Sequence, residues 1–187
     1  MTVTETKPAG WRSGTLPDGV ALMELEPLAD HRGVFTEVFR QSWKTGVKVV
    51  QISLVDSVAR TLRGSHIHLQ HAEIYVAAAG AMLVGMTDLR PASPTFGKAG
   101  LVRLDADDRR LLAIPPGVAH AYYSETDTVL LVGVSSYYDP SDDLGCRWDD
   151  PELGVDWPPI SPILSARDAG AVSLAELRQA LAARGLA

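Results

Sequence analysis

Three histidines and one glutamate in this chain have the types and spacing of ligands for one metal ion. His66 and His68 stand two residues apart, Glu73 follows them, and His120 comes later, just after a Pro-Pro-Gly turn. Side chains at positions i and i+2 of a strand point to the same face, so a strand here would present both imidazoles together. Imidazole nitrogen suits Fe, Zn and Ni, and a carboxylate offsets part of the cation's charge. We therefore expect His66, His68, Glu73 and His120 to hold a divalent transition metal (Fe, Zn, Ni or Mn).

The alternative is that each histidine is an ordinary core or surface residue. The chain has only 5 histidines, however, and three of them occupy the expected ligand positions. Of the other two, we expect His71 at the mouth of the site and His31 in an exposed loop. Four protein ligands on an octahedral metal would leave two positions for substrate, water or dioxygen.

Composition limits the class of protein. A chain of 187 residues is one domain by the length prior and can bury a sizeable core. The net charge of −6 argues against nucleic acid or an anionic membrane as the main partner. Cys146 is the single cysteine, no apolar leader-like segment is visible near the start, and the apolar run around Gly80 is too short to cross a bilayer. These features predict a cytoplasmic protein.

The chain has the organisation of an all-β domain with a helical end. We expect residues 1–15 to form a flexible arm and residues 16–187 to form the single domain. Short apolar runs between turn signals indicate the strands of a barrel or sandwich. Ser173 and Glu176 form a capping-box pattern that predicts a short C-terminal helix on the barrel exterior, with Gly185 after it. The expected strands are 21–25, 34–39, 49–55, 60–68, 73–78, 81–88, 100–104, 110–114 and 129–135.

The ligand pattern resembles the two motifs of the cupin superfamily, H-x-H with a following E and G, and a later P-x-G-x-x-H. Gly80 stands at the G of the first motif and Gly117 at the G of the second. This resemblance implies a cupin jelly-roll β-barrel with the metal inside it.

Longer stretches resemble the dTDP-4-dehydrorhamnose 3,5-epimerase family, and they cover about three quarters of the chain in the same order. Asp30–Arg40 resembles the family's D-x-R-G-x-F-x-E-x-F, and Thr61–His66 resembles its L-R-G-L-H. The resemblance implies a homodimer that acts on a nucleotide sugar. Further matching stretches are 88–90 with 93–97, 114–120, 137–140, 148–151 with 154–158, and 164–168.

The same resemblance assigns catalytic roles and exposes three departures. It implies that His66 removes the proton next to the sugar's 4-keto group and that Asp168 orients the imidazole. The family has a lysine where this chain has Glu73, a glutamine where it has His68, and a proton-donating tyrosine where it has Val132. Two departures create metal ligands and the third removes an acid.

A bound cation could stabilise an enolate as the lysine would. One imidazole nitrogen cannot both bind a metal and accept a proton, so His66 would be ligand or base, not both. If His66 is a ligand, Asp168 becomes its outer partner, and the base is Tyr138, His71 or a metal-bound hydroxide.

The resemblance also implies the substrate-binding residues. Arg32 and Arg63 match arginines that contact the diphosphate, which suits the bidentate guanidinium. Phe35 and Glu37 match positions near the nucleotide base, and Gln51 matches one near the sugar. The alternative for the arginines is structural pairing with acidic loop residues.

These observations together predict an enzyme. The expected function is a metal-dependent isomerase or epimerase acting next to a carbonyl, on a dTDP-4-keto-6-deoxyhexose in deoxysugar or natural-product biosynthesis, with at most one inverted centre because the tyrosine acid is missing. One alternative is an iron cupin oxygenase, lyase or cyclase acting on a non-sugar metabolite. Another is a non-catalytic module that binds a ligand in the same pocket.

Overall fold

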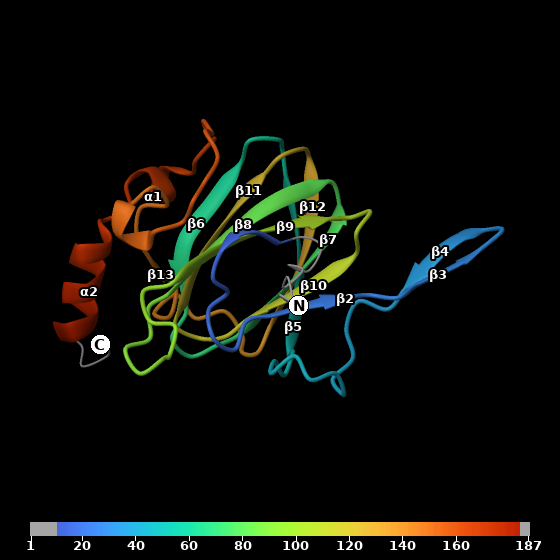
Figure 1. The fold of residues 1–187 in the computed structure, drawn as a ribbon, viewed down its shortest axis with the longest axis horizontal. Helices are drawn as coiled ribbons and strands as arrows, with labels where there is room; N and C mark the ends of the chain where they lie inside the picture. Colours follow the sequence, from blue (N-terminus) through green and yellow to red (C-terminus); the bar gives the residue numbers. More distant parts are fainter. Residues whose placement is uncertain (1–10, 184–187) are drawn as a thin grey trace, which may run out of the picture.

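A computed structural model describes residues 11–183 (Figure 1). Residues 1–10 of the predicted arm, and Gly185, lie outside the described residues. The strands are β1 (Trp11–Gly14), β2 (Ala21–Glu24), β3 (Pro27–Asp30), β4 (Gly33–Thr36), β5 (Gln51–Ser57), β6 (Leu62–Ile67), β7 (Glu73–Ala79), β8 (Ala81–Asp88), β9 (Ala99–Asp105), β10 (Arg110–Ile114), β11 (Val118–Ser124), β12 (Thr128–Val134) and β13 (Leu144–Gly145). A 3₁₀ turn (Pro151–Leu153) and the helices α1 (Ala166–Ala169) and α2 (Leu174–Ala183) follow.

Two antiparallel sheets form the body of the molecule. One has the strand order β1-β9-β8-β11-β6-β13 and the other the order β2-β10-β7-β12-β5. Strands that are distant in sequence pair in both sheets, as in a jelly roll. The expected all-β cupin barrel with a short C-terminal helix is confirmed.

The main core lies between the two sheets. Tyr75 and Leu130 contribute to it from the five-stranded sheet, and Met86, Val102 and Tyr122 from the six-stranded sheet. Gly80 begins the tight β7–β8 connection with φ of 71°, and a Cβ there would lie 2.1 Å from the Asp127 carbonyl oxygen. Only glycine fits that left-handed position, which explains the G of the motif.

Helix α2 begins at the predicted capping box. The Ser173 backbone N–H donates to the Glu176 carboxylate, and the Glu176 N–H donates to the Ser173 hydroxyl oxygen. Leu174, Leu177 and Leu181 are buried against the outer face of the six-stranded sheet. The predicted packing of this helix on the exterior is confirmed. No helix among the described residues is long and apolar enough to span a membrane.

Four strands were not expected from the sequence: β1, β3, β11 and β13. Strand β11 is a central strand of its sheet, so both its faces are buried and it shows no alternation of polar and apolar residues. Strand β1 pairs with β9 from Trp11 onwards, so the chain joins the sheet before residue 16, where the domain was expected to begin. Its four residues are too few to show a strand pattern.

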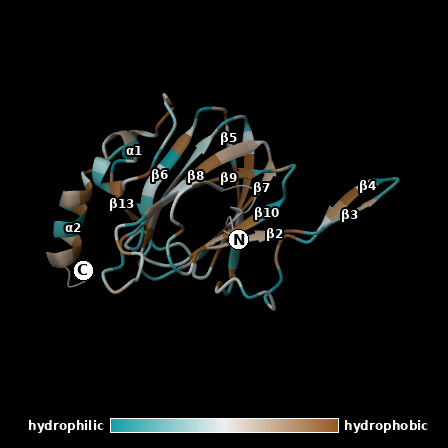
Figure 2. Ribbon diagram, viewed as in Figure 1, coloured by the Kyte–Doolittle hydropathy of each residue, from teal (hydrophilic) through white to brown (hydrophobic). Residues whose placement is uncertain are grey.

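The β3–β4 hairpin projects away from the barrel (Figure 1). The strand expected at 34–39 therefore stops at Thr36, inside this hairpin. Leu28, Val34 and Phe35 are exposed on it, and Figure 2 shows the apolar segments along its length. Exposed apolar side chains of this size on a projecting hairpin favour a partner surface.

Candidate active site and metal centre

Three neighbouring segments carry the candidate site residues: β6 with the turn that follows it, the start of β7, and β11. His66 on β6 lies directly opposite His120 on β11. Gly64 lets these two strands approach, because a Cβ on Gly64 would lie 2.7 Å from the His120 carbonyl oxygen. Glu73 is the first residue of β7 and faces both histidine-bearing strands from the other sheet.

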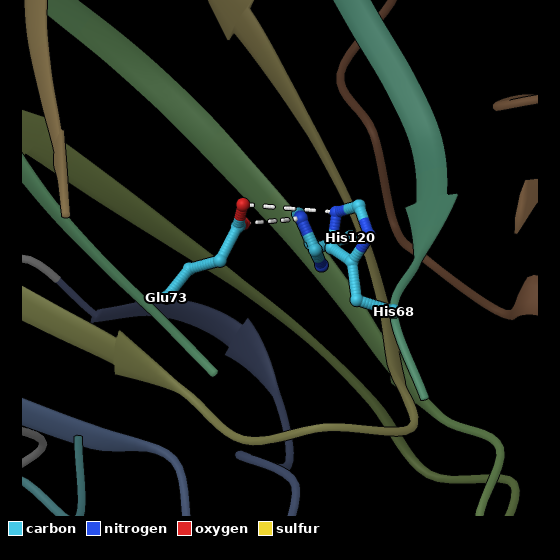
Figure 3. A group of neighbouring side chains, drawn as sticks. All are labelled: His68, Glu73 and His120. Atoms are coloured by element: carbon cyan, nitrogen blue, oxygen red, sulfur yellow. Dashed lines mark ion pairs between the residues drawn. The ribbon is translucent and has the colours of Figure 1, made fainter. Parts of the chain in front are cut away.

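His68, Glu73 and His120 converge inside the barrel (Figure 3). The His120 Nε2 atom lies 2.9 Å from Glu73 Oε2, and the His68 Nε2 atom lies 3.6 Å from Glu73 Oε1. All three residues are buried. The structure thus brings together three of the four predicted ligands.

Hydrogen bonds from Nδ1 of His68 and His120 determine which ring atom faces Glu73. His68 Nδ1 lies 3.0 Å from the Asp142 carbonyl oxygen, and His120 Nδ1 lies 3.0 Å from the Val118 carbonyl oxygen. A carbonyl oxygen only accepts, so each Nδ1 carries a hydrogen, and Nε2 is the ring atom that faces Glu73. Metal-bound histidines in proteins are held in this way.

Two atoms of the cluster lack a hydrogen bond. Glu73 Oε2 and His120 Nε2 are both buried, and although they are close they do not have hydrogen-bond geometry. Ligand atoms about 2.1 Å from a cation lie about 3.0 Å apart at right angles and about 3.4 Å apart in a tetrahedron. The observed separations of 2.9 and 3.6 Å fit a shared cation.

The charges of the cluster support the same conclusion. Burial lowers the pKa of His68 to about 4, so this imidazole is neutral near pH 7 and has a free lone pair. Burial alone would raise the pKa of Glu73, but the neighbouring His120 outweighs it and holds the pKa well below its usual value. The site therefore presents a buried carboxylate beside a neutral imidazole, a suitable environment for a divalent cation.

His66 has a different partner. Its Nε2 atom lies 3.1 Å from Asp168 Oδ1, and its side chain is 24% exposed. Asp168 comes from α1, where the Ser165 hydroxyl donates to its second oxygen. Burial would raise the pKa of Asp168, but the hydrogen bonds from His66 and Ser165 lower it below its usual value. In the part of the chain that the structure describes, His66 belongs to neither group of converging metal-ligand atoms.

The His66–Asp168 contact also determines the tautomer. An ionised carboxylate only accepts, so His66 Nε2 carries the hydrogen and Nδ1 keeps the lone pair. The arrangement is that of a base oriented by a carboxylate. The conflict between ligand and base at His66 disappears, because the cluster forms without it.

The predicted substrate-binding residues fall in two places. Gln51 lies on the half-buried inner side of β5, and Arg63 on β6 donates to the Ser57 hydroxyl, 3.3 Å away. Arg32, Phe35 and Glu37 lie on or beside the projecting hairpin, away from the barrel (Figure 1).

Two of the hairpin residues, Arg32 and Glu37, have ion-pair partners close by in the sequence. No contact between Tyr138 and the cluster of His68, Glu73 and His120 is seen among the described residues. Arg32 pairs with Asp30 at 2.6 Å, which matches the structural alternative for this arginine, and Glu37 pairs with Arg40. Tyr138 is 69% exposed in the loop after β12. Its predicted catalytic role stays a prediction.

Sequence reasoning missed two residues of the pocket. Asp142 is buried, and its carboxylate accepts from the Leu69 N–H at 2.7 Å and from His71 Nδ1 at 2.9 Å. Tyr75 lies directly opposite Val132 and meets the His120 ring edge-on. Asp142 contacts residues more than 70 positions earlier in the chain, and no local pattern indicates such a contact.

Known proteins share this architecture. The family described as dTDP-4-dehydrorhamnose 3,5-epimerase matches residues 15–176. The chain belongs to this family. It is 33% identical to the dTDP-4-dehydrorhamnose 3,5-epimerase of Sinorhizobium fredii over 84% of this chain and 86% of the relative. It is 35% identical to the dTDP-4-dehydrorhamnose 3-epimerase of Streptomyces niveus over 87% and 83%.

Solved structures agree with the assignment to the dTDP-4-dehydrorhamnose 3,5-epimerase family. NovW, a 4-keto-6-deoxy sugar epimerase from Streptomyces spheroides, superposes with a TM-score of 0.81 at 33% identity, over 98% of this chain and 96% of NovW. ChmJ, a 3′-monoepimerase from Streptomyces bikiniensis solved with dTDP-quinovose, superposes with a TM-score of 0.80 at 33% identity, over 91% and 89%. The predicted family and enzyme class are confirmed: this is an isomerase-type enzyme.

Proposed function

We propose that the protein removes and returns a proton at one carbon next to the keto group of a dTDP-4-keto-6-deoxyhexose. The observation that carries this proposal is the His66–Asp168 pair, held at 3.1 Å with the imidazole open to the pocket. Carbonyl α-protons are weak acids, so a base of this kind and a group that stabilises the enolate are both required.

His66 is the base in this account. Its Nε2–H donates to Asp168, so Nδ1 receives the proton. Asp168 stays ionised, because its pKa lies below its usual value, and it stabilises the imidazolium that forms. Inversion requires a proton to return to the opposite face of the enolate, and this proton comes from solvent, so solvent deuterium enters the substrate.

A single centre is proposed because of Val132. This side chain stands where the resemblance implies a tyrosine acid, and it cannot carry a proton. Two of the similar proteins, from Streptomyces niveus and Streptomyces bikiniensis, are named as 3-epimerases. These names support reaction at C3 of the sugar, which is next to the 4-keto carbon.

His68, Glu73 and His120 would hold a divalent transition metal (Fe, Zn, Ni or Mn). The two orphaned buried atoms of Glu73 and His120 and the two outward-held Nδ1 atoms support this assignment. A cation bound there would supply the Lewis acidity that stabilises the enolate oxygen, where the family resemblance implies a lysine. Glu73 itself cannot replace a lysine, since it is an anion.

The binding of a nucleotide sugar is supported by Arg63 and Gln51, which lie at the barrel, and by the relatives solved with dTDP ligands. We propose a homodimer, because Arg32, Phe35 and Glu37 project away from their own barrel (Figure 1). Phe35 is 63% exposed, and Ile52 and Leu54 on the edge strand β5 are exposed as well. In a dimer in which a second copy covers these surfaces, the hairpin residues of one subunit would reach the candidate site of the other. A cytoplasmic location stays a prediction from the sequence.

Deuterium exchange tests the function. We expect the full-length protein, incubated in D₂O with dTDP-4-dehydro-6-deoxyglucose, to introduce one deuterium at C3, measured by mass spectrometry and NMR. Exchange at both C3 and C5 would show the double epimerisation instead. No exchange, together with no dTDP-induced thermal shift, would favour the non-sugar oxygenase, lyase or cyclase alternative or a binding module.

A further inference from the structure

His71 shares its environment with His68 and His120. In all three rings Nδ1 is held by an oxygen: that of His71 by the Asp142 carboxylate at 2.9 Å, and those of His68 and His120 by backbone carbonyls at 3.0 Å. Each of these oxygens only accepts, so Nδ1 is the protonated nitrogen in every case. The same atom, Nε2, is therefore the one that faces the cluster in each ring, and it can bind a cation in the deprotonated form that metal binding requires.

All three Nε2 atoms face one carboxylate. His71 Nε2 lies 3.7 Å from Glu73 Oε1, and His68 Nε2 lies 3.6 Å from that same oxygen. His120 Nε2 lies 2.9 Å from the other oxygen. A distance of 3.7 Å is too long for a hydrogen bond, but it is near the separation of two ligands on one cation. His71 lies outside the group of mutually close ligand atoms that His68, Glu73 and His120 form, so its ring has to move toward that group when a cation binds.

Asp142 holds His68 and His71 in this arrangement. It is buried, its backbone oxygen accepts from His68, and its carboxylate accepts from His71 and from the N–H groups of Leu69 and Gln70. The two rings stack with centroids 4.1 Å apart. One residue of a distant loop thus orients two imidazoles toward Glu73.

His66 does not share this arrangement. Its Nε2 atom faces Asp168 rather than Glu73, and its side chain is more exposed than those of His68, His71 and His120. The spacing in the sequence cannot separate His66 from His71, because both flank His68 within a few residues of Glu73.

We propose that His71, and not His66, completes the metal centre, which then consists of His68, His71, His120 and Glu73. This inference rests on the metal site of the proposed function and names its full ligand set. Three imidazoles and one carboxylate bind the cation, and His66 stays free for proton transfer. Asp142 is a positioning residue, because it acts through His68 and His71.

Cobalt-substituted full-length protein tests the ligand set without an activity measurement. High-spin Co²⁺ shifts the NMR signals of the Nδ1–H protons of its bound histidines far outside the normal range. Because each Nδ1–H is held by an oxygen, we expect three shifted signals that disappear in D₂O. His66→Ala should keep three signals, His71→Ala should show two, and His31→Ala on the hairpin is the matched control.

The outcomes separate this inference from the proposed function. Two signals in the wild type with cobalt bound would overturn the role of His71 but leave the three-residue site intact. Three signals in the wild type but two in His66→Ala would assign the third ring to His66 and overturn the inference. Failure of the wild type to bind Co²⁺ or Zn²⁺ would overturn the metal site itself. The wild-type count needs no variant, so it decides even if His71→Ala does not fold.

Discussion

The His66–Asp168 pair and the cluster around Glu73 are joined by the pairing of His66 with His120 on neighbouring strands, but the chain builds them differently. The pair is partly exposed, and helix α1 supplies its carboxylate, Asp168. The cluster is buried, and oxygens from β11 and from the loop before β13 hold its rings. The pair can meet a substrate, whereas the cluster is shaped to hold a cation.

The two regions also differ in how they relate to the family pattern. By the resemblance described above, His66 and Asp168 match the family's motifs, whereas His68, Glu73 and Val132 depart from them. The two regions use different atoms and different supporting loops, so one can change while the other stays. Under the proposed function, a cation centre replaces the lysine that the family resemblance implies, while His66 is kept as the base.

Removal of the base should have the largest effect. We expect His66→Ala to lower the rate of solvent deuterium exchange about 10²–10⁴-fold, the usual contribution of a positioned base. Mass spectrometry of the substrate after incubation in D₂O measures this rate. An exchange rate within a factor of about two of the wild type would contradict the role of His66.

Removal of the carboxylate in the cluster should rank next. We expect Glu73→Gln to lower the exchange rate about 10²–10³-fold, because the group that stabilises the developing charge is lost. Elemental analysis should show that metal content falls in parallel. Glu152→Gln, on an exposed surface pair with Arg178, is the matched control and should change neither quantity. Full metal content in Glu73→Gln would place the cation elsewhere.

Loss of the orienting carboxylate should cost less. We expect Asp168→Asn to slow exchange about 10–100-fold, as is usual when an outer partner of an imidazole is lost. Its folded-state pKa lies below the ordinary 3.8, so its stabilising contribution is present above pH 3.8 and is lost as the pH falls through the folded value. Thermal unfolding from pH 7 to pH 3 should therefore decline less steeply in the variant. An unchanged slope would show that the pair does not stabilise the fold.

Arg63→Ala tests the nucleotide side of the pocket. Its guanidinium donates to the Ser57 hydroxyl and the Asp56 carbonyl and forms no ion pair with a carboxylate of the described residues, so it is available for a diphosphate. We expect the affinity for dTDP to fall about 10–100-fold, the effect of losing one or two charge-assisted hydrogen bonds. Calorimetry measures this affinity, and Arg147→Ala, in a surface pair with Asp149, is the control. Equal affinities in the two variants would remove Arg63 from the binding site.

The smallest effect should come from a residue that belongs to neither region. Ser173 caps α2, and Ser173→Ala should lower the free energy of unfolding by about 1 kcal/mol. Denaturant unfolding measures this change. The exchange rate at 25 °C should stay the same, and a large loss of activity would mean that α2 supports the pocket more directly than its packing suggests.

The sequence predicted the barrel well because its strands carry local signals. Gly80 and the capping box at Ser173 each require one backbone conformation, and the structure has both. Strand β11 was missed because a central strand with two buried faces lacks alternation. Its position nevertheless brings His120 opposite His66, as a shared site requires.

The candidate site was only partly predictable. Three of the four expected ligands converge, although His68 lies just beyond the end of β6 and His120 comes from β11. The direction of His66 depends on Asp168, a residue 102 positions away, and that of His71 depends on Asp142. Contacts of this kind follow from the fold and leave no periodic trace in the sequence.

Zinc titration of His66→Ala tests the central claim most directly. The claim is that the base and the cation centre are separate groups in one pocket. Calorimetry should show one equivalent of Zn²⁺ bound to His66→Ala with the affinity of the wild type, even though exchange is lost. Loss of zinc binding in a folded His66→Ala would contradict the account, because His66 would then be a ligand and some other group would have to be the base.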